Sequence, residues 1–153
     1  MAAYLEPYRR LARWPLGRWL FSRVACWRAP YFASIRPLVV DYRAGYAEVR
    51  IPDRRGVHNH IGTVHAIALC NLAELCGGLT VDSQMPADLR WIPSGMTVNY
   101  VKKARGTITG KCSLDASAVR EGTVVTHVEA FDPQGTLVFT ADINFYVSRA
   151  RSR

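Results

Sequence analysis

The stretch TVHAIALCNLAELCGGLTV (63–81) constrains this chain more than any other, because nearly every position in it is apolar or small. Its length favours a helix over a strand, and Thr63 is the expected N-cap. A helix that lacks a polar face must be buried nearly all round. The rest of the chain must therefore wrap it, and a strongly curved antiparallel sheet can do so.

Strand patterns flank this helix on both sides. The segment IRPLVVDYRAGYAEVRIPD (35–53) predicts two strands with a turn at Arg43-Ala44-Gly45, and residues 53–62 read as a loop. Residues 82–93 contain two prolines and are expected to form a connection. Four further strand-like segments follow, at 94–104, 106–117, 122–132 and 135–147.

In the first of these four segments, Met96, Val98 and Tyr100 alternate with Thr97 and Asn99. This alternation is typical of a sheet with one buried face, so the four segments predict an antiparallel meander. The predicted fold class is α+β, with about six strands curved around one long central helix and an extra helix at the N-terminus.

The chain of 153 residues suits one domain with a proper core. We divide it into an amphipathic helical segment at 1–34, the main domain at 35–148 and a basic tail at 149–153. The first segment mixes arginines with aromatic residues, and Pro15 is expected to divide it. We favour a helix packed on the domain with its arginines facing water. A membrane-surface helix and an organelle transit peptide are the alternatives.

The net charge of +8 is concentrated at the two ends of the chain. Residues 1–34 carry six Arg and one Glu, residues 149–153 carry three Arg, and residues 35–148 are neutral. Nucleic-acid binders more often place a basic excess on a continuous face of the core, so no nucleic-acid partner is expected.

The cysteines show no metal-binding spacing, which predicts free, buried thiols, no metal site and a cytoplasmic location. They are Cys26, Cys70, Cys76 and Cys112.

Glu74 is the one carboxylate of the apolar helix, where an unpaired acid is costly to bury. It is either a structural group, paired with an arginine of this chain or of a partner, or a functional one. Asn71 and Gly78 share its face. His65 lies nine residues earlier, on the opposite side of the helix. The two can serve one site only if two subunits build it; otherwise His65 orients the preceding loop.

The start of the helix offers a second chemical feature. Backbone N–H groups near His65 and Ala66 lack partners within the helix, as at any helix N-terminus. Such donors can stabilise a carbonyl oxygen that gains negative charge during acyl transfer.

The pattern Asn59-x5-His65-Ala66-x7-Glu74 resembles the signature of hotdog-fold acyl-CoA thioesterases, particularly the phenylacetate-degradation-type branch. That signature is Asn, five residues, His-Gly, seven residues, then Asp or Glu on the central helix. The segment PSGMTVNYVKKARG (93–106) resembles the strand that follows the helix. As a whole, the chain is most similar to an uncharacterised hotdog branch of proposed thioesterases. It departs from the signature at Ala66, which replaces Gly.

The resemblance implies a homodimer, or a dimer of dimers, that hydrolyses an acyl-CoA or a similar thioester at sites shared between subunits. Coenzyme A enters as part of the substrate, and no separate cofactor is expected. Glu74 is implied to be the nucleophile or general base, Ala66 N–H the oxyanion donor and Asn59 the group that positions water or substrate.

The remaining roles are assigned in the same way. His65 holds the loop, and Thr97 is the candidate for the Ser or Thr that the family often has on the strand after the helix. Asn71 is expected to contact substrate. The phosphates of coenzyme A are expected at a basic cluster, whose alternative is a solvated strand end: Lys102, Lys103 and Arg105.

Two other functions fit the same fold. Hydratase-type hotdog enzymes use an Asp and a His near the central helix, and Asp53-x4-His58 has that spacing. The second is a non-catalytic protein that binds acyl-CoA or an acyl lipid, suggested by Ala66 and by the basic, aromatic N-terminus. This non-catalytic function includes contact with a membrane surface, which we do not favour.

Overall fold

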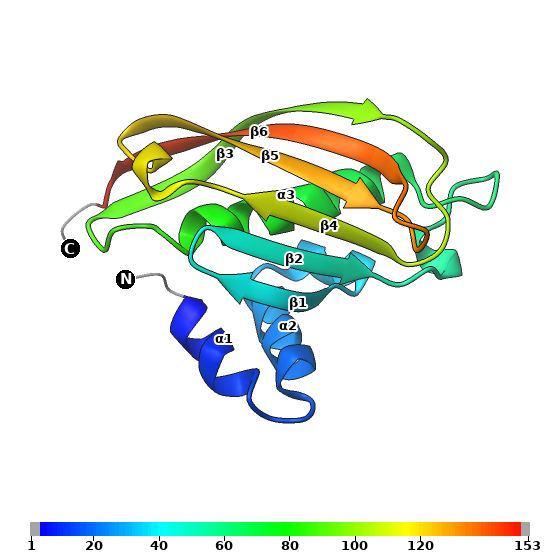
Figure 1. The fold of residues 1–153 in the computed structure, drawn as a ribbon, viewed down its shortest axis with the longest axis horizontal. Coiled ribbons are helices and arrows are strands. Elements are labelled where there is room, and N and C mark those ends of the chain that lie inside the picture. The colour runs from blue at the N-terminus through cyan, green and yellow to red at the C-terminus, as the bar shows by residue number, and fades with distance from the viewer. Residues whose placement is uncertain (1–3, 151–153) are drawn as a thin grey trace.

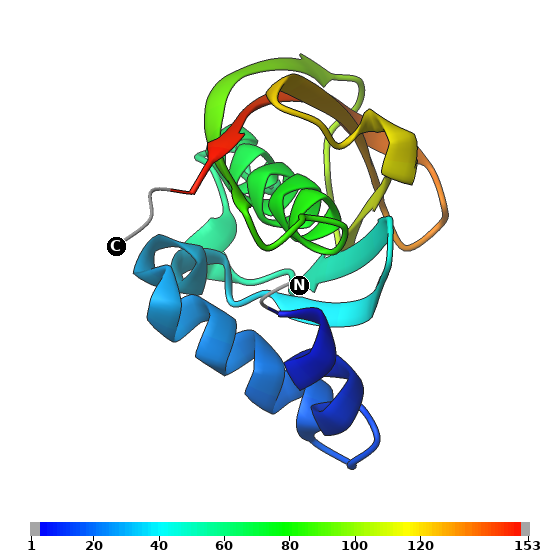
Figure 2. The ribbon, with the colours of Figure 1, turned by 90° about the vertical axis from the view of Figure 1, so that its left-hand side faces the viewer.

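The computed structural model describes residues 4–150, and its centre is the long helix α3 (Ala66–Asp82). The helix lies in the concave face of a curved sheet, as Figures 1 and 2 show from the side and from one end. Leu72, Cys76 and Val81 are fully buried against the sheet. The prediction of one apolar helix enclosed by a curved sheet is confirmed.

Six strands form this sheet, in the order β1-β2-β4-β5-β6-β3, and all neighbouring strands are antiparallel. They are β1 (Leu38–Arg43), β2 (Tyr46–Ile51), β3 (Leu89–Tyr100), β4 (Ile108–Ser113), β5 (Gly122–Phe131) and β6 (Leu137–Arg149). The α+β class and the two-strand hairpin before the helix are as predicted, and the arrangement is the hotdog fold.

The position of β3 corrects two expectations. It pairs with β6 at the far edge of the sheet, so only β4, β5 and β6 form a meander. It also begins at Leu89, within the stretch that was expected to be a connection. The proline at position 93 fits because β3 is an edge strand, and the register shifts between Pro93 and Gly95.

The N-terminal segment forms α1 (Leu5–Leu11), α2 (Gly17–Arg28) and the short 3-10 helix η1 (Pro30–Ile35), with Pro15 between the first two. Phe21 and Cys26 of α2 are buried against the domain. Trp19 and Trp27 are exposed, although the favoured packing placed the arginines and not the aromatic residues in water. The helix has two apolar faces, and the contact with β1 buries only one of them.

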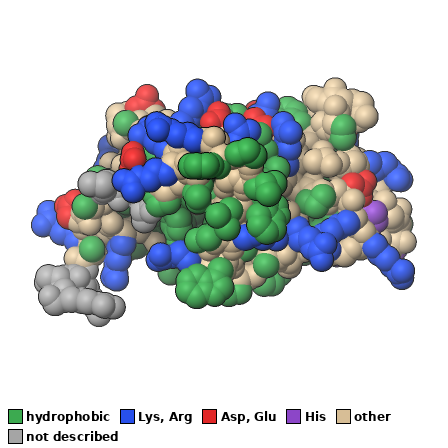
Figure 3. Space-filling view, turned by 90° about the horizontal axis from the view of Figure 1, so that it is seen from below, with side chains coloured by type: hydrophobic (Ala, Val, Ile, Leu, Met, Phe, Trp, Pro, Cys, Tyr) green, Lys and Arg blue, Asp and Glu red, His purple; other side chains and the backbone are tan. Residues whose placement is uncertain are grey.

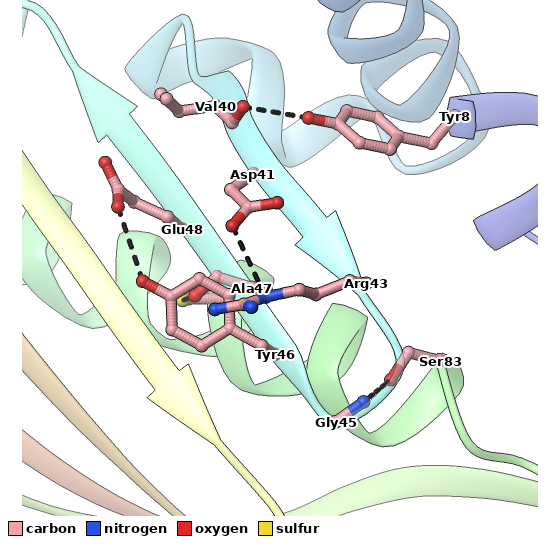
Figure 4. A network of polar contacts seen from close by, with 10 residues as sticks. Tyr8, Val40, Asp41, Arg43, Gly45, Tyr46, Ala47, Glu48 and Ser83 are labelled. Atoms are coloured by element: carbon pink, nitrogen blue, oxygen red, sulfur yellow. Dashed lines mark hydrogen bonds and ion pairs between the residues drawn. The ribbon is translucent and has the colours of Figure 1, made fainter. Parts of the chain in front are cut away.

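Polar contacts fix the β1–β2 hairpin to the helices on either side of it (Figure 4). The Tyr8 hydroxyl of α1 donates to the carbonyl of Val40 at 2.8 Å. At the hairpin turn, Gly45 N–H donates to Ser83 Oγ at 2.8 Å, just after α3 ends. Gly45 adopts a positive φ of 71°, which glycine tolerates best.

Two more 3-10 helices interrupt the loops, η2 (Arg55–Val57) and η3 (Ala116–Ala118). The strand β6 continues to Arg149, which pairs with Glu121 at 2.7 Å, so the first residue of the predicted basic tail belongs to the sheet. Residues 151–153 of that tail lie outside the described residues. Within residues 4–150, no helix is both long enough and apolar enough to cross a membrane.

Candidate active site

His65 caps the N-terminus of α3, where Thr63 was expected to do so. Its Nδ1 accepts a hydrogen bond from Ile67 N–H at 3.0 Å, which requires that ring nitrogen to be unprotonated. The Thr63 hydroxyl lies two residues before the cap position and accepts from Asn59 Nδ2 at 2.8 Å. The contact fits the role implied for His65, which is to hold the loop at the start of the helix.

Asn59 organises the turn that leads to this cap. Its Oδ1 accepts from the backbone N–H groups of Ile61 and Thr63, each at 3.1 Å. Its amide nitrogen has already donated to Thr63, so one N–H remains for water or substrate. Asn59 is thus mainly a loop-forming residue, with limited capacity for a ligand.

Ala66 is the first residue of α3, and its backbone N–H has no hydrogen-bond partner within residues 4–150. The next N–H bonds to the His65 ring, and Ala68 N–H bonds to the His65 carbonyl at 2.9 Å. The start of the helix therefore keeps one free donor, and the positive end of the helix dipole lies behind it.

This free donor opens onto a surface groove of about 450 Å³. The groove brings together four residues predicted for the site: Asn59, Ala66, Lys102 and Lys103. Tyr100 at the end of β3 also lines it and was not predicted. Its hydroxyl lies 3.4 Å from Cys70 Sγ, and this hydrogen bond raises the pKa of Tyr100 to about 12.

Glu74 lies two helical turns further along α3, in a different cavity. Its side chain is half-buried, and no hydrogen bond or salt bridge joins it to any other described residue. A structural pairing with an arginine of the same chain is therefore absent within residues 4–150. A half-buried carboxylate without a partner is costly unless a ligand or another subunit completes its surroundings.

The cavity at Glu74 measures about 130 Å³ and lies between α2, η1, α3 and the start of β3. Trp91 and Asp82 also line it, and neither was singled out in the sequence. Trp91 packs edge-on against Phe145, with ring centroids 5.1 Å apart. Burial raises the pKa of the Asp82 carboxyl, whose Oδ2 accepts from the Tyr42 hydroxyl at 3.3 Å.

One chain does not bring Glu74 to the Ala66 N–H. Eight residues of helix separate them, which is about 12 Å along the axis at 1.5 Å per residue. A thioester carbonyl requires both groups within hydrogen-bonding reach. The two groups can therefore act on one carbonyl only if two subunits build the site.

Three predicted residues lie elsewhere. Thr97 pairs in register with the exposed Asp142, on the convex face of the sheet away from α3. Asn71 is buried and donates to Ser34 Oγ at 3.1 Å. Arg105 is exposed just beyond the groove. Thr97 lies away from both Glu74 and Ala66, whereas Asn71 is one helical turn from Glu74 but lines a different pocket, with His58 and His65. The roles of Thr97 and Asn71 stay predictions.

The structure brings Asp53 and His58 together, because His58 Nε2 contacts Asp53 Oδ1. The other oxygen of Asp53 accepts from Gly106 N–H at 2.8 Å. The hydrogen bond with His58 and that with Gly106 N–H hold the pKa of Asp53 below its ordinary value. The pair pins the loop after β2 to the loop before β4.

No group of three or more metal-ligating His, Cys, Asp or Glu side chains gathers within residues 4–150. All four cysteines are free thiols, as predicted. Cys26, Cys76 and Cys112 are buried, whereas Cys70 was expected to be buried and is only half-buried.

Several solved structures share this fold. The chain is 45% identical to a protein designated genomics APC5556, with a TM-score of 0.84 over 97% of this chain and 98% of that one. It is 26% identical to a Pseudomonas aeruginosa protein of unknown function described as a probable thioesterase. The TM-score between this chain and the Pseudomonas aeruginosa protein is 0.72, over 79% and 88% of the two chains.

A Haemophilus influenzae thioesterase shares the fold at 12% identity, with a TM-score of 0.72 over 80% and 85% of the two chains. The resemblance to the hotdog-fold thioesterases is thus confirmed. The chain belongs to the family described as domain of unknown function DUF4442, whose model matches residues 17–147. No match was found among curated proteins.

Proposed function

We propose that this protein is a homodimeric thioesterase that hydrolyses acyl thioesters of coenzyme A at two sites shared between its subunits. The observation that carries the proposal is the pair of unpartnered groups on α3. Glu74 is a half-buried carboxylate in a cavity, and Ala66 offers a free N–H at a groove. A thioesterase needs a base or nucleophile and an oxyanion donor, and these two groups have those chemistries.

The edge strand β3 supports the dimer. It is twelve residues long, pairs within residues 4–150 only with β6, and exposes Ile92 and Tyr100. Long unpaired edges with apolar side chains usually pair with another strand. Antiparallel pairing of β3 with its copy about a two-fold axis continues the sheet and sets the two α3 helices antiparallel. The Ala66 end of one helix then approaches the Glu74 region of the other.

In the proposed reaction, the carboxylate of Glu74 accepts a proton from water while the water oxygen attacks the thioester carbonyl carbon. The N–H of the other subunit's residue 66 stabilises the resulting oxyanion, aided by the dipole of α3. Collapse of the tetrahedral intermediate breaks the C–S bond. The proton held by Glu74 passes to the departing thiolate, which leaves a carboxylic acid and free coenzyme A.

Lys102 and Lys103 support coenzyme A as the carrier, because they line the same groove as the Ala66 N–H. Ammonium groups bind phosphates as point charges, and Arg105 lies next to them in the chain. The acyl chain would extend from the carbonyl toward the apolar cavity between α2 and α3. Reduced cysteines agree with a cytoplasmic location, which stays a prediction.

The test is a panel of acyl-CoA substrates of different chain lengths, assayed by detection of the released thiol. The wild-type protein should release thiol, and Glu74→Gln should slow release by about 10²–10⁴-fold, as loss of a general base does. Glu129→Gln, an exposed position on β5, is the matched control and should match wild type. Absence of thiol release from every substrate, or a fully active Glu74→Gln variant, contradicts the proposal.

The oxyanion donor can be removed with little disturbance, because Ala66 is the first residue of a helix and proline is well tolerated there. The preceding His65 has φ −65° and ψ 140°, an extended conformation compatible with a following proline. Ala66→Pro should lower kcat by about 10²–10³-fold. Ala116→Pro, which also follows an extended cap residue and begins η3, is the control and should keep full activity.

A hydratase is the second candidate, and the contact between Asp53 and His58 favours it. An assay of water addition to an enoyl-CoA tests this reading directly, with the loss of enoyl absorbance as the measured signal. Hydration that His58→Ala abolishes would replace the thioesterase proposal. Tight binding of acyl-CoA with neither reaction would instead indicate a non-catalytic binding protein.

A further inference from the structure

The outer face of α2 carries an exposed apolar stripe that the fold leaves uncovered. Leu20, Val24 and Trp27 project from one side of the helix, opposite the buried Phe21 and Cys26. The stripe continues into the turns at both ends of the helix. We call the full set the aromatic ridge: Trp14, Leu16, Trp19, Leu20, Val24, Trp27 and Tyr31. Side chains of this kind gather on the underside of the molecule in Figure 3.

The exposure of the aromatic ridge is built into the docking of α2, because polar contacts fix the opposite face. Ser22 Oγ accepts from Val39 N–H of β1 at 2.9 Å. Arg23 Nη2 donates to the carbonyl of Pro37 at 3.0 Å. Rolling the helix to bury Trp27, which is 82% exposed, would break both contacts and expose Phe21. A patch this apolar on a fixed surface normally marks an interaction site.

The charges around the aromatic ridge indicate which kind of partner it binds. Arg10, Arg13 and Arg18 are exposed, and none of them forms a salt bridge within residues 4–150. The only acid in residues 4–34 is Glu6, which Arg9 already pairs at 3.0 Å. A second copy of the same face would bring these arginines against each other, which is unfavourable. An anionic surface that accepts aromatic side chains is the complementary partner.

We propose that the aromatic ridge docks this protein on the surface of an anionic lipid bilayer. Tryptophan favours the membrane interface, where its ring is apolar and its N–H meets the headgroups. Arginines beside the ridge lie close enough to meet lipid phosphates while their stems cover apolar surface. The ridge follows α2 and the turn before it, where Trp14, Leu16, Trp19 and Leu20 line an open apolar groove of about 570 Å³, and it inserts without unfolding. A surface-bound helix needs none of the length of a membrane span.

Docking would also bring the bilayer surface close to the cavity at Glu74. Ala25 and Ala29 at the inner side of α2 line that cavity, while the ridge occupies the outer side of the same helix. The bilayer surface would then lie about one helix diameter, roughly 10 Å, from the cavity. This arrangement suits acyl thioesters whose long chains partition into the bilayer, an inference that rests on the proposed thioesterase function.

Co-sedimentation of the full chain with vesicles tests the docking independently of any activity. Phosphatidylcholine vesicles with about 30% phosphatidylglycerol should pellet the protein, and pure phosphatidylcholine should pellet much less. The triple variant W14S/W19S/W27S should lose at least about tenfold in affinity for the anionic vesicles. The double variant R10E/R13E should also lose about tenfold or more, and this loss should shrink at high salt.

The control variant V125S/Y146S removes two apolar side chains from the convex face of the sheet, each 52% exposed, and should bind like wild type. Circular dichroism and gel filtration establish that every variant is folded. Point variants are required because Leu5, Tyr8 and Phe21 belong to the core, so truncation would expose it. Equal pelleting of wild type and W14S/W19S/W27S overturns the proposal. So does ridge-dependent self-association, or binding to random single-stranded DNA, without binding to vesicles.

Discussion

The helices α2 and α3 are both rich in apolar residues, yet their surroundings differ completely. The sheet and the N-terminal segment bury α3 on nearly every side, and the one carboxylate in its middle lies at a cavity. The domain buries only one face of α2 and leaves the other to solvent. Apolar composition therefore does not decide burial by itself; what decides is whether the rest of the chain can cover each face.

The largest expected difference in stability between the two helices comes from equivalent leucine truncations. Leu72 of α3 is fully buried, so Leu72→Ala should cost about 2–5 kcal/mol of unfolding free energy. Leu20 of α2 is 44% exposed, and Leu20→Ala should stay within about 0.5 kcal/mol. Denaturant unfolding measures both. A large cost at Leu20 would break the comparison, because it would mean that the outer face of α2 is covered in solution.

Two adjacent glycines sharpen the comparison within α3. A Cβ at Gly77 would lie 2.8 Å from Thr126 Oγ1 and 3.1 Å from Ile143 Cδ1, both in the closed core. Gly77→Ala should therefore destabilise by about 1–3 kcal/mol. A Cβ at Gly78 would lie 2.9 Å from the outer edge of the Trp91 ring, which is only partly buried and can move.

Gly78→Ala should thus be close to neutral, since the gain in helix propensity, about 1 kcal/mol, offsets a shift of Trp91. Thermal unfolding of the two variants gives the contrast. Equal destabilisation by both would show that the cavity face of α3 is packed as tightly as its core face.

The smallest effect concerns Asp82, at the end of α3. Burial raises its pKa in the folded protein, so its stabilising contribution is complete below the unfolded pKa of about 3.9 and is lost as pH rises through the folded pKa. Asp82→Asn carries no charge at any pH and should escape this loss. Its Tm should exceed that of wild type at about pH 7 and approach it at about pH 4. A difference that is independent of pH would contradict this origin.

Local sequence patterns predicted the elements well. The helix was expected at 63–81 and lies at Ala66–Asp82, and the turn at Arg43-Ala44-Gly45 is correct. The far-edge position of β3 was missed because strand order depends on pairing between distant segments, which periodicity does not record. The early start of β3 was missed because Pro93 suggested a connection, although an edge strand tolerates it.

The aromatic residues of α2 were predicted to pack on the domain because the arginines identified one face as solvent-facing. The sequence does not reveal that a helix with two apolar faces has only one of them covered. Hydrophobic periodicity identifies candidate buried faces, whereas coverage depends on the tertiary partner.

For the candidate site, the family resemblance singled out Asn59, Ala66 and Glu74, whose roles stay predictions. The nine-residue offset between His65 and Glu74 predicted that the two serve one site only if two subunits build it. The groove then brings Lys102 and Lys103 to the Ala66 end of the helix. Trp91 and Tyr100 were missed because both lie on β3 and reach these cavities only through its pairing with β6.

The central claim, a site shared between two subunits, is tested most directly by mixed dimers. Glu74→Gln and Ala66→Pro subunits are each expected to form inactive homodimers, but a mixed dimer contains one intact site. Unfolding and refolding an equal mixture should restore about a quarter of the wild-type thiol release, because half of the dimers are mixed and each has one active site. If both groups act within a single chain, mixing restores nothing, and that result would contradict the account.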